Sequence, residues 1–122
     1  MSTTTLASIA MTYRLSISAA DLLGADALST YEDALSAALE RAYPDAVVFV
    51  DARLARCDES TYRATCTTVD GVELHVWRDG VGRVEIGVDP EALTYAASEA
   101  ICENFRHADE TAWERACEAV EA

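Results

Sequence analysis

The chain has 122 residues, of which 51% are hydrophobic, and its 22 acidic residues outweigh nine arginines and no lysine to give a formal net charge of −13. This length and hydrophobic content favour one globular domain with one core and exclude a disordered chain. An excess of negative charge repels nucleic acid and anionic membranes, so we expect direct binding to neither. No apolar run approaches the roughly 18 residues of a membrane-spanning helix.

The first ten residues, MSTTTLASIA, are predicted to form a flexible N-terminal arm ahead of a single domain at 11–122. They are too polar for a signal peptide and lack its basic start, so we expect a cytoplasmic protein. The cysteines should then be reduced thiols, because the cytoplasm is a reducing compartment. No pair of them has CxxC spacing, which disfavours a zinc site. The two histidines are not near-neighbours of any two cysteines, and we predict no metal or cofactor site.

Alternation of Tyr13, Leu15 and Ile17 with polar residues predicts a first strand with one buried face. An apolar helical stripe then predicts a helix at residues 30–43, preceded by Ser29 and Glu32 at capping-box spacing and stopped by Pro44. The segment AVVFVDAR, residues 46–53, is nearly all apolar at its start. It is interpreted as a central strand buried on both faces.

Three further strands are predicted at residues 61–69, 72–78 and 83–88. For the first hairpin, a two-residue Asp70-Gly71 turn places Thr65, Thr67 and Val69 inside, whereas a three-residue loop including Val72 places Tyr62, Ala64 and Cys66 inside. Turn chemistry favours the first alternative, and burial favours the second slightly more.

The second hairpin needs an odd-length loop for its two aliphatic faces to match. A three-residue loop at 79–81 pairs Val76 with Val84, and on the outer face Trp77 with Arg83 and His75 with Glu85. A five-residue loop is expected to keep the same register.

Asp89 and Pro90 suit the N-cap and first position of a helix, and a break is expected at residues 106–111 before a second helix begins. The order is therefore β-α-β-β-β-β-α(α). This predicts an α+β fold, a single domain with a mixed or antiparallel sheet of about five strands and helices on one face. The other sheet face is either open or closed by a partner.

Glutamates in the C-terminal segment recur at helical spacing. Glu99 and Glu103 form one row on a helix face, and Glu110, Glu114 and Glu118 form another. Such rows are usually no more than a solvated face. The alternative is a row of negative charges that stands in for phosphates in a basic groove. The predicted partner-binding set consists of these five glutamates, the loop acids Asp58 and Glu59, and the outer-face residues His75, Trp77 and Arg83.

No Walker, GxGxxG, GxSxG or HExxH motif is present, and the chain is predicted not to be an enzyme. The alternative is a hydrolase centred on Cys66 and His75 as cross-strand neighbours, with Glu85 orienting the histidine.

In size and acidity the chain resembles small phage-encoded anti-defence proteins, such as anti-CRISPR and anti-restriction proteins, through composition rather than any motif. The resemblance implies a nucleic-acid mimic that inhibits a CRISPR effector or restriction enzyme in a bacterial host cytoplasm. The second hypothesis is a small homodimeric interaction or structural domain that uses the open sheet face. Its acidity would then reflect halophile-type or GC-rich composition.

Overall fold

The computed structural model describes residues 5–121. Within them the chain forms β1 (Leu6–Ser16), α1 (Ile17–Leu23), α2 (Ala27–Ala42), β2 (Val47–Ala55), β3 (Thr61–Thr68), β4 (Glu73–Arg78), β5 (Val84–Gly87) and α3 (Tyr95–Glu121). The five strands form one sheet in the order β2-β1-β3-β4-β5, in which β1 and β2 are parallel and the other neighbours antiparallel. This confirms the predicted α+β class and element order.

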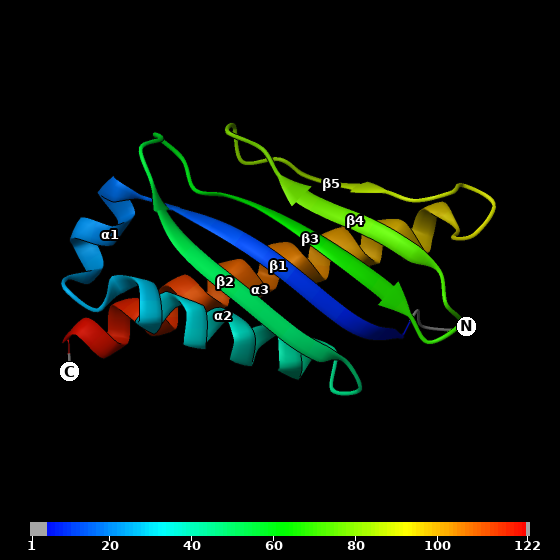
Figure 1. Ribbon diagram of the computed structural model, residues 1–122, viewed down its shortest axis with the longest axis horizontal. Coiled ribbons are helices and arrows are strands. Elements are labelled where there is room, and N and C mark those ends of the chain that lie inside the picture. The colour runs from blue at the N-terminus through cyan, green and yellow to red at the C-terminus, as the bar shows by residue number, and fades with distance from the viewer. Residues whose placement is uncertain (1–4, 122) are drawn as a thin grey trace.

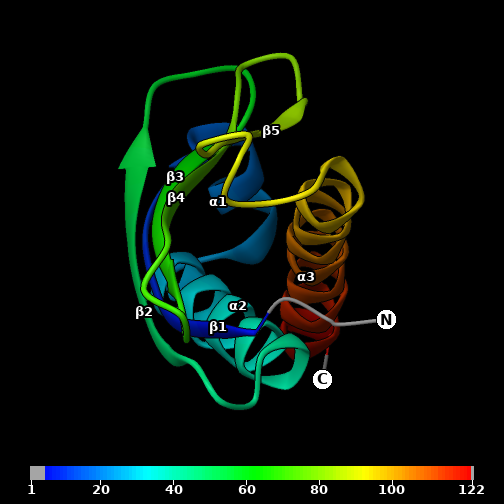
Figure 2. The ribbon, with the colours of Figure 1, turned by 90° about the vertical axis from the view of Figure 1, so that its right-hand side faces the viewer.

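Helices α2 and α3 cover one face of the sheet, and α1 lies at the end where β1 stops (Figures 1 and 2). Alternation along β1 sends Met11, Tyr13 and Leu15 into the core between sheet and helices, where they meet the buried Leu35 and Leu39 of α2. The other face of the sheet is uncovered by any described helix. Among the described residues, no helix is both long and apolar enough to cross a membrane.

The N-terminal arm predicted for residues 1–10 is wrong from Leu6 onward, because β1 already begins there. Leu6 and Ile9 are both buried in the core. A register irregularity between Leu6 and Ser8 breaks the simple alternation, and this hid the strand in the sequence. Residues 1–4 lie outside the described part of the chain.

The segment interpreted as a central strand is instead the edge strand β2. Val47 is 76% exposed and Phe49 66% exposed on the uncovered sheet face. The apolar run therefore does not signify burial on both faces. The interior strands are β1, β3 and β4, and their sequences alternate because only one face of the sheet is covered.

In the first hairpin, the backbone N–H of Thr68 donates to the carbonyl of Val72, which leaves residues 69–71 as the loop. Tyr62, Ala64 and Cys66 are buried, as the favoured alternative predicted, although Val72 lies outside the loop.

The second hairpin has the predicted odd loop, but it contains the five residues 79–83. Asp79 closes it by accepting the backbone N–H groups of Val81 and Arg83. Relative to the three-residue alternative, every pair shifts by two residues. Trp77 therefore opposes Glu85 rather than Arg83, and His75 opposes Gly87 rather than Glu85.

Helix α2 begins at Ala27, three residues before the predicted start. The expected capping box is absent, because Asp26 is the N-cap and Ser29 lies within the first turn of the helix. Glu32 reaches the sheet instead. Its carboxylate accepts the backbone N–H of Ala52 in the edge strand at 3.2 Å. The spacing of Ser29 and Glu32 therefore resembles a capping box, although Glu32 joins the helix to the edge strand.

Helix α3 differs from its prediction at both its start and its middle. Asp89 and Pro90 form a turn, in which Asp89 accepts the N–H of Glu91, and the helix begins only at Tyr95 with Thr94 capping the N–H of Ala97. The expected break at 106–111 is absent, and α3 runs unbroken to Glu121. Small buried alanines in this stretch, Ala108 and Ala112, let α3 pack closely on its neighbours without interruption.

Candidate functional site

The unbroken course of α3 brings the two predicted glutamate rows onto one helix face. At 3.6 residues per turn, the five side chains fall within an arc of about 100° and extend over about 28 Å. They form what we call the acidic stripe, and all are exposed: Glu99, Glu103, Glu110, Glu114 and Glu118. The buried residues of α3, such as Ile101 and Ala112, lie on the opposite side of the helix. Arg106 is the cation that interrupts the stripe, and it pairs with Glu103.

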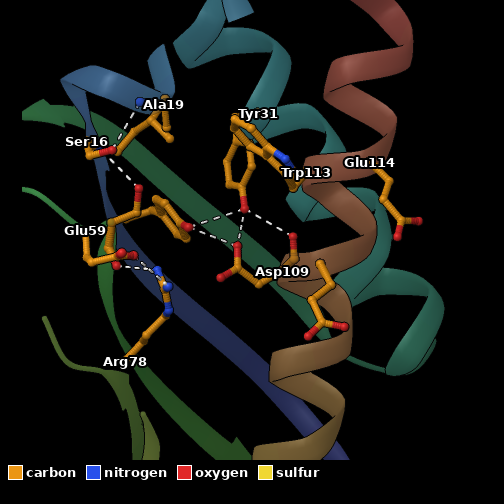
Figure 3. A pocket seen from close by; sticks show the side chains of 12 residues that line it. Ser16, Ala19, Tyr31, Glu59, Arg78, Asp109, Trp113 and Glu114 are labelled. Carbon is orange, nitrogen blue, oxygen red and sulfur yellow. Dashed lines mark hydrogen bonds and ion pairs between the residues drawn. The ribbon is translucent and has the colours of Figure 1, made fainter. Parts of the chain in front are cut away.

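A cleft of about 430 Å³ opens beside the acidic stripe, at the end of the sheet where β1 runs into α1 (Figure 3). Helix α3 supplies one wall of it. The other walls come from the end of β1, the first half of α2, the last residue of β4 and the loop between β2 and β3. Glu110 and Glu114 belong to both the stripe and the cleft wall.

Asp109 is the centre of this cleft. Its Oδ1 accepts hydrogen bonds from the hydroxyls of Tyr13, at 2.9 Å, and of Tyr31. The other oxygen points into the cleft (Figure 3), and no group among the described residues donates to it. Burial raises the pKa of the Asp109 carboxyl above its usual value, against the two tyrosine bonds and the charge of Arg78, which lower it.

The two tyrosines beside Asp109 act as hydrogen-bond donors. Burial, reinforced by the negative charge of Asp109, raises the pKa of both Tyr13 and Tyr31. Their hydroxyls therefore keep their protons throughout the physiological range. Tyr62 stacks on Tyr13 with ring centroids 5.7 Å apart, and its buried hydroxyl has no partner among the described residues.

Arg78 enters the cleft from β4 with its charge already compensated. It donates to the carbonyl of Ser60 and to the Glu59 carboxylate at 3.3 Å. Ser60 in turn accepts the backbone N–H of Ser16, and Ser16 caps α1 through the N–H of Ala19. The loop that carries Glu59 is thereby tied to the start of α1.

Tyr13, Tyr31 and Asp109 are not among the site residues predicted from the sequence. Both tyrosines look like ordinary core residues in their amphipathic patterns. Asp109 falls in the segment 106–111, where the sequence predicts a break between helices and an acidic residue needs no special explanation. An aspartate on the inward side of an unbroken helix is the signal that reveals the site, and it is visible only once the helix is known to continue.

Three members of the predicted partner-binding set lie on or beside the uncovered sheet face. His75 contacts the Thr65 hydroxyl at 3.3 Å. The Trp77 indole donates to Glu85 at 3.2 Å, and Arg83 pairs with Asp79 in the hairpin loop. These are local contacts within the hairpin and its neighbouring strand.

The structure thus divides the predicted set between two surfaces. The acidic stripe lies on the helical side, together with Glu59, which lines the cleft with Glu110 and Glu114. Asp58 is exposed in the same loop but does not line the cleft. His75, Trp77 and Arg83 belong to the sheet side, across the full thickness of the domain.

Cys66 and His75 do not come together. Cys66 opposes Leu74 and is buried on the covered face, whereas His75 points from the uncovered face. Burial raises the pKa of the Cys66 thiol to about 12, so the group remains protonated. Among the described residues, no three His, Cys, Asp or Glu side chains are grouped closely enough to hold a metal ion.

No model of a known protein family matches the chain. No curated protein and no solved structure matches it either. We therefore infer function from the charge and geometry of the two surfaces and the cleft.

Proposed function

We propose that the protein is a non-enzymatic acidic binding protein whose acidic stripe engages a basic surface of a nucleic-acid-handling complex, as an inhibitor of the anti-CRISPR or anti-restriction type. The observation that carries this proposal is the continuity of α3, which aligns five exposed glutamates on one face. The site of action would be the bacterial host cytoplasm.

The spacing of the stripe suits a surface that normally receives phosphates. Five carboxylates over about 28 Å give one charge every ~7 Å on average, compared with one every ~3.4 Å along a DNA strand. Neighbouring glutamates four residues apart repel each other by a few tenths of a kcal/mol per pair. A basic groove would relieve that repulsion. Because the glutamates of the stripe are exposed, their attraction to a basic groove is screened by ions, and we expect binding to weaken as salt rises.

Displacement of DNA tests this proposal. A labelled duplex is bound to each of a panel of purified CRISPR effectors and restriction enzymes, and the protein is titrated in at low salt. We expect at least one member to lose its duplex. A protein that displaces duplex from none of them would contradict the proposal.

Two quadruple variants distinguish the contribution of the stripe to DNA displacement from that of the protein's overall net charge. The first neutralises four stripe residues: Glu99→Gln, Glu110→Gln, Glu114→Gln and Glu118→Gln. The control makes the same charge change at exposed acids elsewhere: Asp21→Asn, Asp33→Asn, Glu40→Gln and Asp45→Asn. We expect the first variant to weaken displacement at least about tenfold, and the control to weaken it far less. Equal losses would mean that net charge, not the stripe, does the binding.

A second candidate function is a homodimeric interaction domain, favoured by the exposure of Phe49 and Val47 on the edge strand. Edge strands with exposed apolar side chains readily pair with another chain. Light scattering would then give twice the 13.2 kDa chain mass, and Phe49→Ser would return the monomer. The matched control is Val81→Ser, which changes an exposed valine in a hairpin loop. A monomer at all concentrations would dismiss this candidate.

A further inference from the structure

The cleft beside the acidic stripe has an uncompensated negative charge. Four of its lining residues are carboxylates: Glu59, Asp109, Glu110 and Glu114. The cation that lines the cleft, Arg78, is already bound to Glu59 and to a backbone carbonyl. A carboxylate held away from water is costly unless it is paired, and two tyrosine bonds to a single oxygen leave the other oxygen of Asp109 available.

The cleft wall also carries aromatic rings suited to a cation. Tyr31 and Trp113 lie side by side with ring centroids 6.3 Å apart, next to Asp109 (Figure 3). A ring face attracts a nearby cation, and the attraction grows when the cation is desolvated. A guanidinium group is planar, so it can stack on such a ring while two of its N–H groups reach a carboxylate.

The cleft and the stripe are continuous, because Glu110 and Glu114 belong to both. A basic partner lying along α3 therefore passes the mouth of the cleft. The cleft has a volume of about 430 Å³, which lies in the range of ligand pockets and accommodates a single long side chain.

We propose that this cleft is the binding site for a guanidinium group, supplied by one arginine side chain of the basic partner, with Asp109 as its carboxylate and Trp113 as its stacking surface. The site deepens the proposed function and rests on it for the identity of the partner. An arginine buried in this way is a typical anchor of a protein interface, while the stripe gives the long-range attraction.

The test uses the protein alone and a small probe. The chain has two tryptophans, and Trp77 lies on the sheet side, so Trp77→Phe leaves Trp113 as the only indole reporter. N-acetyl-arginine methylamide is titrated at low salt while Trp113 fluorescence is recorded. The citrulline analogue, which has the same shape without the charge, is the control ligand. We expect a saturable change at about millimolar arginine analogue and none with the citrulline analogue.

Two substitutions in the same background locate the site. Asp109→Asn keeps an acceptor for both tyrosine hydroxyls but removes the charge, and should weaken binding at least about tenfold. Glu40→Gln removes an exposed charge that lies outside both the stripe and the cleft, and should change affinity less than about threefold. Equal binding of the two ligands, or an unchanged affinity in Asp109→Asn, would overturn the site.

NMR chemical shifts of the wild-type protein keep the test decisive if Asp109→Asn does not fold. The arginine analogue should shift the Trp113 indole and the backbone amides of α3 near Asp109. It should leave the amides of residues 73–76 in β4 unchanged, because they lie away from Arg78, the β4 residue that lines the cleft. Shifts confined to β4 and β5 would overturn the site. Guanidinium binding in the cleft without displacement of DNA from any effector would refute the proposed function alone. Displacement of DNA from an effector without guanidinium binding in the cleft would refute the cleft as an arginine site and leave the proposed function standing.

Discussion

The solvent face of α3 and the uncovered face of the sheet differ sharply in charge. The stripe on α3 carries five glutamates and one arginine. The sheet face carries three arginines, Arg14, Arg53 and Arg63, against the three acids Asp51, Glu73 and Glu85. Acidity that served only solubility or salt adaptation would spread over both faces. Its concentration on the helical side favours a specific use of that side.

The two faces also differ in what holds their side chains in place. On the sheet face, Trp77 and Glu85 bond across a hairpin, and Phe49 is exposed on an edge strand. The stripe depends instead on one long helix whose opposite side is anchored in the core by Phe105 and Ala112. Alignment of the stripe is therefore a consequence of helix continuity, and a change that breaks the helix should affect one face and not the other.

Breaking α3 should have the largest effect. His107 is exposed at the middle of the helix. His107→Pro removes a helical hydrogen bond and clashes with the preceding turn, so we expect a loss of about 3 kcal/mol in the free energy of unfolding, measured in urea. His107→Ala, the control, should stay within about 0.5 kcal/mol. A proline variant as stable as the alanine variant would contradict a continuous helix.

Reversing the stripe should come next. A triple variant should weaken binding to the effector that loses its DNA about a hundredfold, or about 2.7 kcal/mol, because attraction becomes repulsion. Its substitutions are Glu110→Lys, Glu114→Lys and Glu118→Lys. The matched control reverses Asp21, Asp33 and Glu40, which lie outside the stripe. Equilibrium titration at fixed salt measures both. Unchanged affinity in the stripe variant would exclude the stripe as the binding surface.

Asp109→Asn should have a smaller effect on stability, and one of opposite sign. Burial raises the pKa of this carboxyl, so the folded protein binds the proton more tightly than the unfolded chain does. Removing the buried charge should stabilise the fold by about 1 kcal/mol at pH 7. The gain is full above the folded pKa and disappears as pH falls toward the unfolded value, ~3.9. Urea unfolding at pH 7 and pH 4 measures it. Destabilisation at both pH values would show that Asp109 serves the fold.

The sheet face should respond least. Glu85→Gln weakens one exposed hydrogen bond to Trp77 and should change the free energy of unfolding by less than about 0.5 kcal/mol. It should also leave displacement of DNA from the effector unchanged. A strong loss of displacement in this variant would move the binding surface to the sheet.

The sequence was informative where a pattern had one structural cause. Alternation in β4 and matching aliphatic faces predicted the odd hairpin loop, and helical spacing predicted the exposed glutamates. Prediction failed where one residue type could serve more than one structural role. Asp79 accepts two backbone N–H groups, which lengthens the loop to five residues and shifts its pairs. Glu32 joins α2 to β2, and Pro90 begins a turn rather than a helix.

The candidate cleft was beyond prediction for a similar reason. Tyr13, Tyr31 and Asp109 come from three elements, and 96 residues separate the first from the last. Their meeting depends on how α3 packs across the sheet, which no local pattern encodes. The five glutamates of the stripe were predicted, but as two separate rows. Their alignment on one face depends on a helix that continues through residues 106–111, a segment rich in polar residues.

The most direct test of the acidic stripe as the binding surface is hydrogen–deuterium exchange on the complex of the protein with the effector from which it displaces DNA. Amide exchange is compared in free and bound protein across α3 and β4. We predict slower exchange along residues 99–118, where the stripe lies, and unchanged exchange at residues 73–76 of the sheet. Protection confined to β4 and the edge strand β2, with α3 unaffected, would contradict the account.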